Sequence, residues 1–323
     1  MRVDVHSHVL PSGYAERLGG GPAVDSQGVA AVLGAAAELA DLEARLGLMD
    51  ETGIDVSILS LPPPGPGFGL LGTVAEVAAE ANDEMLDLAA LASGRFGVLI
   101  ALPLPDSEAA IEEVRRLADH PLVCGAAAIV DHGHWDPADP EHDPLYAELG
   151  ARGLPLMLHP GIEELPAAYG DWNLALALGA PVASTLGILR LVLGGSLDRA
   201  PSLTPIVPHL GGLWPYLTQR VDDQCAAPAG LVPSARLANR ILLDTCSFHP
   251  PALRCALDTV GVDRVLLGSD FPFRGKPARC VEDIEDLQLT MTERDAILGD
   301  NACRHLPGAP LAGTVETSGE VAL

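Results

Sequence analysis

The chain has 323 residues, of which 48% are hydrophobic. This length allows one large domain, such as an α/β barrel of about 250 residues, or two ordinary domains. The formal net charge of −25, from 19 basic and 44 acidic side chains, argues against nucleic acid and anionic membrane surfaces as partners, because binding phosphates requires clusters of Lys and Arg.

The sequence also indicates a cytoplasmic protein without a membrane segment. We find no run of about 18 uninterrupted apolar residues, and the chain enters a strand directly, with no charged and then apolar signal region. The cysteines are scattered and none belongs to a C-x-x-C pair, so we expect reduced thiols and no disulfides. They are Cys124, Cys225, Cys246, Cys255, Cys280 and Cys303.

The first predicted element is a strand within residues 2–11, Arg-Val-Asp-Val-His-Ser-His-Val-Leu-Pro. Its valines favour a strand, and Pro11 ends it. His6 and His8 lie two residues apart, so on a strand both imidazoles leave the same face and can bind one metal ion. Such a pair is also common by chance on a half-exposed strand. A metal site therefore needs further ligands from other strands, since catalytic zinc takes about three protein ligands.

Residues 12–40 are rich in Gly and Pro and then in Ala. They are too long for an ordinary connection between a strand and a helix, and we interpret them as a candidate lid. A helix is predicted at 39–52, where the apolar residues have helical spacing and Gly53 ends the pattern. A strand at 54–61 follows and gives way to a loop rich in Pro and Gly.

From residue 73 onward, helices and strands alternate. Helices are predicted at 73–93, 106–119, 144–152, 181–194, 214–226 and 251–260, and strands at 96–102, 123–130, 154–159, 204–209, 241–245 and 264–269. The strands are apolar runs, which is typical of a parallel sheet covered on both faces. Eight strands, each followed by a helix, predict an α/β fold, the closed (β/α)8 TIM barrel. We expect one domain at 1–306, with an insertion at about 11–40, and a loose tail at 307–323.

Enzymes with this barrel place their catalytic groups at the C-terminal ends of the strands. Residues that can bind metal occupy such positions in four of the predicted strands: His6, His8, His159, His209 and Asp270. A lone histidine there is more often a hydrogen-bonded core residue, but five such residues together predict a metal site. Imidazoles with one carboxylate suit zinc or another divalent transition-metal ion.

The remaining histidines are weaker candidates. His132 and His134 form a second His-x-His, but they fall in a loop with several Asp and Pro residues, where solvated polar side chains are expected. The fourth strand ends at Asp131 without a lysine, so a two-metal site bridged by a modified lysine is not available. We expect one metal ion.

Motifs spread from Val3 to about Leu306 point to a family. They are Asp-Val-His-Ser-His at the start, Leu-Met-Asp-Glu-Thr-Gly-Ile at 48–54, Gly-Arg-Phe-Gly at 94–97, His-Pro-Gly at 159–161, Pro-His-Leu-Gly-Gly at 208–212, Leu-Leu-Gly-Ser-Asp-Phe-Pro-Phe at 266–273 and Asp-Asn-Ala at 300–302. With them the chain resembles the amidohydrolase-type metal enzymes. Within these it resembles the branch of aminocarboxymuconate-semialdehyde decarboxylase and 6-methylsalicylate decarboxylase.

This resemblance implies a site with one metal ion, usually zinc, with manganese as the other option. The ligands it implies are His6, His8, His159 and Asp270. It places His209 nearby as the acid/base group, and we expect Asp270 to be catalytic as well as a ligand.

In this branch two arginines often bind the substrate carboxylate, and the matching positions are Arg45 and Arg220. Judged from the residues alone, Arg45 and Arg220 are ordinary helix-surface residues. Only the bidentate geometry of the guanidinium favours them as groups that bind a carboxylate. Along a helix, Arg220 would lie about 16 Å beyond His209, which is a long way for its side chain to reach back into its own barrel mouth. In the branch that this chain resembles, the matching arginine reaches the active site of the neighbouring subunit. We therefore predict a twofold homodimer. The alternative is that Arg220 pairs with Asp222, Asp223 or another surface carboxylate.

The resemblance favours a metal-dependent, non-oxidative decarboxylase of a small aromatic or unsaturated, muconate-like carboxylic acid. The metal would polarise the substrate, and His209 or a metal-bound water would handle the proton. The alternative is a metal-dependent hydrolase of a lactone, amide or ester, because the fold does not fix the function. A non-catalytic barrel that binds a ligand or protein would predict an eroded ligand set, which the sequence does not show.

Overall fold

The computed structural model describes residues 1–20, 27–68, 70, 72–130, 135–162, 165–247, 249–273 and 278–312. Several sequence-based predictions fall outside these ranges. They concern Asp131, His132, His134, residues 21–26 of the expected insertion and residues 313–323 of the expected tail. Within the described ranges, strands and helices alternate along the chain.

Eight strands form one parallel sheet, each paired with the next in chain order. They are β1 (Val3–His8), β2 (Val56–Ser60), β3 (Phe96–Ala101), β4 (Val123–Val130), β5 (Leu156–Pro160), β6 (Pro205–Val207), β7 (Leu242–Asp244) and β8 (Val265–Leu266). The sheet closes on itself, because the Val5 N–H donates to Leu267 O at 2.9 Å and the His8 N–H donates to Phe271 O at 3.0 Å. The predicted (β/α)8 barrel is therefore confirmed.

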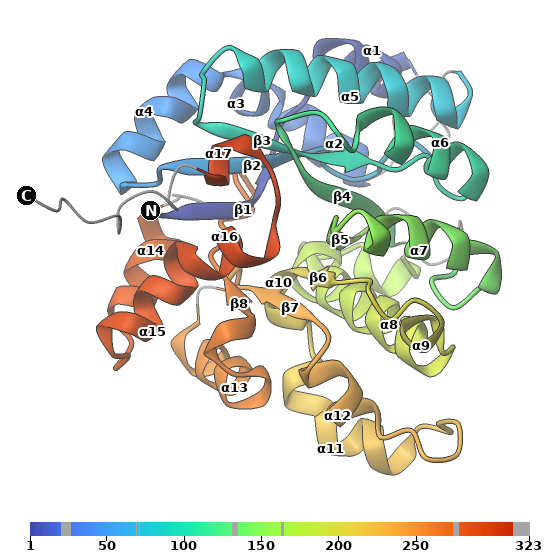
Figure 1. Cartoon of the computed structure of the whole chain (residues 1–323). Helices are drawn as coiled ribbons and strands as arrows, with labels where there is room; N and C mark the ends of the chain where they lie inside the picture. Colours follow the sequence, from blue (N-terminus) through green and yellow to red (C-terminus); the bar gives the residue numbers. More distant parts are fainter. Residues whose placement is uncertain are drawn as a thin grey trace, which may run out of the picture.

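Helices surround this barrel (Figure 1). Those between the strands are α4 (Leu42–Thr52), α5 (Val74–Ala90), α6 (Ser107–Leu117), α7 (Asp143–Ala151), α8 (Ala180–Leu193), α11 (Trp214–Gln224), α12 (Pro233–Ala238) and α13 (Pro250–Val260). The C-terminal ones are α14 (Ala278–Glu285), α15 (Met291–Asp295), α16 (Asn301–His305) and α17 (Ala309–Ala312). Short turns of helix are α9 (Ser196–Arg199), α10 (Pro208–Gly211), η1 (Pro140–His142), η2 (Ala167–Tyr169), η3 (Ala175–Gly179), η4 (Val262–Arg264) and η5 (Ala296–Asp300). Figure 1 shows β1 beside the C-terminal helices, as closure requires.

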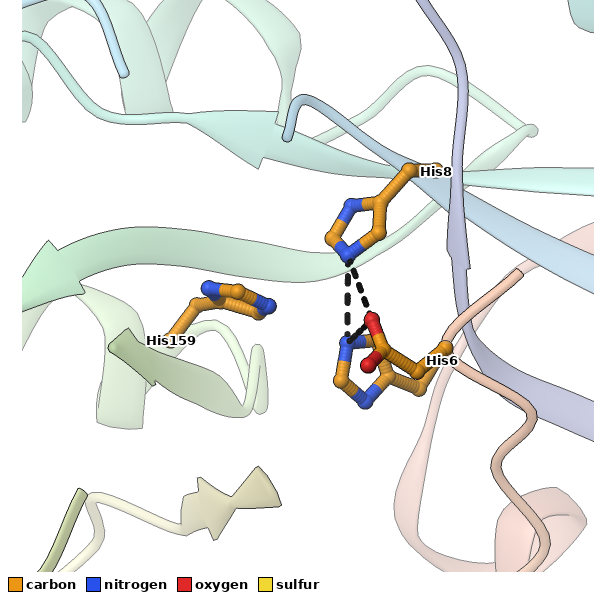
Figure 2. Close-up of side chains that lie close together, drawn as sticks. His6, His8 and His159 are labelled. Atoms are coloured by element: carbon orange, nitrogen blue, oxygen red, sulfur yellow. Dashed lines mark hydrogen bonds and ion pairs between the residues drawn. The ribbon is translucent and has the colours of Figure 1, made fainter. Parts of the chain in front are cut away.

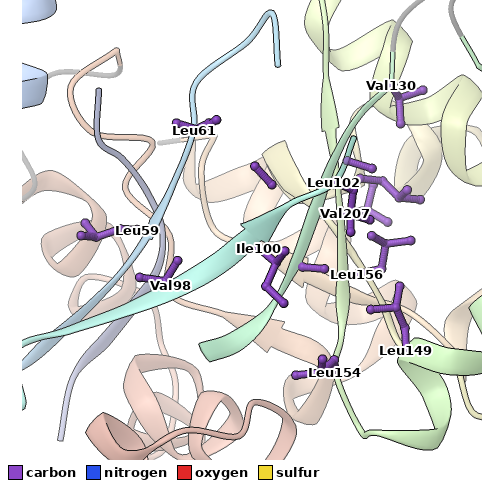
Figure 3. Packing of buried hydrophobic residues seen from close by; sticks show 14 of the residues in the cluster. Leu59, Leu61, Val98, Ile100, Leu102, Val130, Leu149, Leu154, Leu156 and Val207 are labelled. Atoms are coloured by element: carbon purple, nitrogen blue, oxygen red, sulfur yellow. The ribbon is translucent and has the colours of Figure 1, made fainter. Parts of the chain in front are cut away.

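Hydrophobic side chains fill both faces of the sheet. On the outer face, Ile100 and Leu156 pack in the cluster between strands and helices (Figure 3). Alternate residues pack inside the barrel with three residues from the C-terminal helical region, and this inner cluster includes Val56, Ile58, Leu99, Met157, Ile206, Leu242, Leu266, Ala302, Leu306 and Leu311. Because apolar side chains fill the barrel interior, the polar groups of a site gather at the carboxyl ends of the strands, which form the barrel mouth.

The insertion expected at about 11–40 is helical where it is described, in α1 (Ser12–Gly20), α2 (Gln27–Gly34) and α3 (Ala36–Ala40). Val29, Val32 and Leu39 are buried in the outer core. The expected tail begins with α17, whose Leu311 is also buried. The described parts of both segments are therefore packed against the barrel.

The continuous helical stretch Ala175–Leu193, made of η3 and α8, has a mean hydropathy of 1.8. It is long and apolar enough to cross a membrane by length and composition. Ser184, Thr185 and Arg190 interrupt its apolar residues, so it is not a run of about 18 uninterrupted apolar residues. Half of the apolar window is buried inside the protein, and α8 packs against β5. A core helix of a barrel meets the same criteria, and this packing identifies it as one.

Asn82 connects α5 to β3 and α6 through buried hydrogen bonds. This fully buried residue of α5 accepts the N–H of Ala101 at 2.8 Å and donates to Ala101 O at 3.1 Å and to Glu113 Oε1 at 2.7 Å. We expect Asn82→Ala to lower the free energy of unfolding by about 2–4 kcal/mol in urea denaturation, because buried polar groups lose their partners. The control Asn239→Ala removes one exposed bond to Ala235 and should change it by less than about 0.5 kcal/mol. Equal effects would contradict the assignment.

Candidate metal centre

Four side chains that can bind a metal ion converge at the barrel mouth. His6 and His8 come from β1, His159 from β5 and Asp270 from the loop after β8, and their ligand atoms all lie within 4.8 Å of one another. His6 Nε2 lies 3.2 Å from His8 Nε2, and Asp270 Oδ1 lies 3.2 Å from His8 Nε2. Figure 2 shows nitrogen atoms of His6 and His8 facing one another, with His159 beside them. The structure thus brings together the four ligands predicted from the sequence.

An irregularity in β1 aims its two histidines. Val3 and Val5 belong to the inner cluster of the barrel, so strict alternation would turn His6 outward. The register between β1 and β2 shifts between Asp4 and Ser7. A bulge of this kind re-aims the side chains that follow it, which lets the imidazoles face inward above the valines.

Hydrogen bonds hold each imidazole by its other nitrogen. His6 Nδ1 lies 2.6 Å from Asp244 Oδ2, His8 Nδ1 lies 3.2 Å from Ser60 Oγ, and His159 Nδ1 lies 3.0 Å from Pro160 O. Partners of this kind fix the ring orientation and leave Nε2 for a metal.

Two buried imidazole nitrogens of the site, His159 Nε2 and His209 Nδ1, have no hydrogen-bond partner among the described residues. An unpaired buried polar atom costs about 1–3 kcal/mol. An ion held by His6, His8, His159 and Asp270 would satisfy His159 Nε2, and three imidazoles with one carboxylate suit a divalent transition-metal ion. The residues present therefore fit a divalent metal.

Charge states in the metal-free protein agree with this role. Burial opposes the ionisation of Asp270, but the charge of His6 and hydrogen bonds from His209 and His8 hold its pKa well below the usual range. Burial, together with the neighbouring histidines, lowers the pKa of His8 and, more strongly, that of His159. An ionised carboxylate and neutral imidazoles are the forms that bind metals.

His6 differs, because burial lowers its pKa but Asp270 and Asp244 outweigh burial and raise it to about 9. A metal ion that binds His6 Nε2 near neutral pH therefore displaces a proton.

Two residues of the site have a left-handed backbone. His209 has a φ of 57°, followed by Leu210 at 55°, and Asp270 has a φ of 54°. Such residues end regular strand pairing, so β6 and β8 stop before the predicted ends at 209 and 269. Each costs about 1–3 kcal/mol of strain and is characteristic of functional sites. His209 Nε2 lies 3.4 Å from Asp270 Oδ2, which places His209 beside the four-ligand set.

A cavity of about 170 Å³ opens above the ligands, with His159, His209 and Asp270 at its base. Its walls come from α2, η3, α8 and the loops that follow β2, β5 and β8. Among the described wall residues only Asn173 is polar, and the others are Ala31, Val32, Pro63, Pro160, Ile162, Leu176, Ala177, Ala180 and Phe273. A concave, mostly apolar pocket with a few convergent polar groups is typical of a small-molecule site.

The two predicted substrate arginines lie elsewhere. Arg45 is 3% exposed and does not line this cavity. Its guanidinium donates to Ser7 Oγ at 3.1 Å and to the His8 carbonyl oxygen, and it lies over the ring of Phe271. The predicted contact between Arg45 and a substrate carboxylate stays a prediction, because this geometry shows Arg45 supporting the end of β1.

Arg220 is exposed on α11. Within the described part of one chain it forms no ion pair, and the carboxylates proposed as alternative partners bond elsewhere. Asp222 accepts the Ser234 N–H at 2.9 Å, and Asp223 accepts from Gln219 at 2.9 Å.

Sequence reasoning missed Ser60 and Asp244, which hold the imidazoles of His8 and His6. Both stand at the carboxyl end of a strand, so the rule that found the ligands could have found them. Asn173 gave no comparable signal, because no strand or motif marks it.

The closed barrel and the mixed imidazole and carboxylate site define a class, the metal-dependent enzymes of the amidohydrolase type. The profile of the amidohydrolase family matches residues 3–308. The chain belongs to this family.

Curated relatives narrow the branch. A 2-amino-3-carboxymuconate-6-semialdehyde decarboxylase from Dictyostelium discoideum is 26% identical over 286 residues, which cover 82% of this chain and 76% of that protein. A gamma-resorcylate decarboxylase from Rhodococcus jostii (strain RHA1) is 30% identical over 264 residues, covering 73% and 79%. Both relatives are decarboxylases, a class of carbon–carbon lyases, so the predicted resemblance to this branch is confirmed.

Solved structures agree. A 2,6-dihydroxybenzoate decarboxylase complexed with 2,6-dihydroxybenzoate has a TM-score of 0.81 and 25% identity, covering 94% of this chain and 98% of that chain. A dihydroxybenzoic acid decarboxylase from Polaromonas sp. JS666, with bound manganese, has a TM-score of 0.80 and 23% identity, covering 94% and 96%. The latter likeness shows the shared fold.

Removing a ligand should remove the metal. We expect His159→Ala and Asp270→Ala to bind a divalent ion more than about 100-fold more weakly than the unaltered protein and to lose activity, because each removes one of four ligands. Chelator competition and elemental analysis measure this. His120→Ala, at an exposed loop position, is the control and should keep its metal. Full activity in a metal-free preparation would end this interpretation.

A second prediction concerns Asp4, whose carboxylate accepts hydrogen bonds from Ser269 Oγ at 2.6 Å, Ser269 N–H at 3.0 Å and His6 N–H at 3.1 Å. Burial outweighs these bonds and raises the pKa of Asp4 to about 6. Between about pH 4 and 6 the folded protein therefore holds a proton that the unfolded chain has lost, so this group makes stability fall as pH rises through that window.

We expect Asp4→Asn to remove this contribution. Relative to the unaltered metal-free protein, the variant should gain about 3 kcal/mol as the pH rises from 4 to 6, and the difference should then stay constant. Urea denaturation of both metal-free proteins across this range measures the difference. A difference independent of pH would show that folding does not raise the pKa of Asp4.

Proposed function

We propose that the protein is a metal-dependent, non-oxidative decarboxylase of a small aromatic or unsaturated carboxylic acid. One observation carries this proposal: four buried candidate ligands converge at one point, and two of them, His159 and Asp270, line a mostly apolar cavity together with His209. The similarity to decarboxylases supports it.

A divalent ion at these ligands would act as a Lewis acid that withdraws charge from the substrate carboxylate or a neighbouring oxygen. The chain's own residues supply the rest. His209, at the cavity base, delivers the proton that replaces CO2 on the substrate carbon when the carbon–carbon bond breaks. Asp270, 3.4 Å from His209 Nε2, orients that imidazole in addition to holding the metal. Apolar walls such as Leu176 and Phe273 exclude competing water.

Aromatic acids fit this cavity better than muconate-like dicarboxylates. No lysine or arginine lines it among the described residues, and the guanidinium of Arg45 is bonded to Ser7 and His8. Within one chain a second carboxylate would therefore be buried without a cationic partner, which is costly, so a muconate-like dicarboxylate would depend on the partner subunit's Arg220. An aromatic ring would instead contact apolar walls.

Three finer assignments belong to this proposal. Zinc is the proposed ion because three imidazoles favour it, and elemental analysis distinguishes it from manganese. The compartment is proposed to be the cytoplasm, because free cysteines are expected in a reducing compartment.

A homodimer is proposed as well. Tyr216 is 83% exposed and lies one helical turn before Arg220, on the same face of α11. An exposed aromatic ring beside an arginine that is unpaired within the described part of one chain supports an interface at which Arg220 approaches the site of the partner subunit.

Release of CO2 tests the function. The protein should release CO2 from hydroxylated aromatic acids, and His209→Ala should keep most of its metal yet lose at least about 100-fold in kcat, because it removes proton transfer. Ring opening of a lactone without CO2 release would favour the hydrolase alternative. A His209→Ala protein that loses metal as completely as His159→Ala would make His209 a ligand.

Mixed dimers test the sharing of Arg220. Arg220→Ala and His209→Ala chains should each be inactive, whereas an equal mixture should recover about a quarter of the activity, since half the dimers carry one intact site. Light scattering gives the mass. An active monomer, or a mixture without recovery, would rule the arrangement out.

A further inference from the structure

We infer that Asp244 is a positioning residue. Its single carboxylate holds both the metal ligand His6 and the proton-transfer residue His209 in position. This inference rests on the proposed metal site and not on the identity of the substrate. Asp244 is the last residue of β7 and is completely buried. Its Oδ2 lies 2.6 Å from His6 Nδ1, and its Oδ1 accepts the N–H of His209 at 2.8 Å and that of Cys246 at 3.0 Å.

The bond to His6 selects the form of the imidazole that binds metal. A carboxylate can only accept, so it keeps a hydrogen on His6 Nδ1 and leaves the lone pair on Nε2. That Nε2 lies 3.2 Å from His8 Nε2 and 3.4 Å from Asp270 Oδ1, where the ligands converge. Asp244 Oδ2 bonds the opposite edge of the ring and Oδ1 accepts two backbone N–H groups, so Asp244 acts through His6 and is not a ligand itself.

The bonds from Oδ1 hold the strained turn after β6. His209 and Leu210 both have left-handed backbones, a strained conformation that persists only where the surrounding structure enforces it. Asp244 accepts the His209 N–H from the neighbouring strand and so pins the start of this turn. Since the same carboxylate bonds His6, it fixes the spacing between the metal and the proton donor.

Gly268 provides the room for this arrangement. A Cβ at Gly268 would lie 2.9 Å from Asp244 Cβ and 3.1 Å from His6 Cβ. Real Cβ atoms rarely come so close, so a side chain at this position would push the pair apart. The absence of a Cβ in the segment that follows β8 is a second, independent sign that the packing here serves the contact between Asp244 and His6.

Two substitutions separate the two functions of the carboxylate. In Asp244→Asn the side-chain oxygen keeps its two backbone N–H donors, which turns the amide NH2 toward His6 Nδ1. The imidazole must then accept at Nδ1 and carry its hydrogen on Nε2, where the metal binds. In Asp244→Ala both sets of bonds are lost.

We expect Asp244→Asn to bind a divalent ion about 10- to 100-fold more weakly than the unaltered protein, measured by chelator competition on metal-free protein. Hydrogen exchange should show a protected His209 amide in the unaltered protein and in Asp244→Asn, and an unprotected one in Asp244→Ala. The matched control is Asp136→Asn, which loses an ion pair with Arg190 and keeps its bond to the Ala138 N–H. It should leave metal affinity unchanged.

Metal binding by Asp244→Asn within about threefold of the unaltered protein, or a protected His209 amide in Asp244→Ala, would overturn the inference. If the unaltered protein bound no divalent ion, the proposed function would fail first. Should the variants not fold, ¹⁵N NMR of the zinc-loaded unaltered protein, with the His6 signal assigned by His6→Gln, decides instead. A hydrogen on His6 Nδ1 supports the inference, and a His6 Nδ1 without hydrogen overturns it.

Discussion

Hydrogen bonds between β1 and the segment that follows β8 hold this site together. The Asp270 N–H donates to His6 O at 2.8 Å, next to the bonds by which β8 closes on β1. His8 and Asp270 are 262 residues apart in the chain, yet their ligand atoms lie 3.2 Å apart. Any change that loosens this seam between β8 and β1 therefore alters the metal site directly, whereas a change on the opposite side of the barrel reaches it only through the sheet.

The ligand cluster conflicts with the stability of the metal-free fold. His6, His8, His159 and Asp270 are all buried at one point, where burial disfavours every charged form and one imidazole nitrogen stays unpaired. The fold tolerates this because surrounding groups, including Asp4, Ser60 and Asp244, accept or donate hydrogen bonds. A ligand that binds only the folded state adds stability in proportion to the logarithm of its concentration, so a bound metal ion would stabilise the fold.

Much of the architecture could be predicted from the sequence, because apolar runs at regular intervals mark parallel strands and the strand-end rule selects His6, His8, His159 and Asp270. The exact strand ends could not, since the left-handed turns at His209 and Asp270 depend on partners from neighbouring strands. The position of Arg45 was missed for a similar reason. Its helical spacing suggests a surface residue, but its contacts with Ser7 and His8 appear only once α4 packs on β1.

The cavity and the metal ligands come from different parts of the fold. Strands and the turns that end them supply the ligands, whereas Leu176 and Ala177 in the cavity wall belong to η3, a π-helical turn that leads into α8. Such turns are often found at functional sites. Divergence among family members can therefore reshape the wall through this turn and keep the ligands, so that substrate preference and metal binding evolve as separate traits on one scaffold.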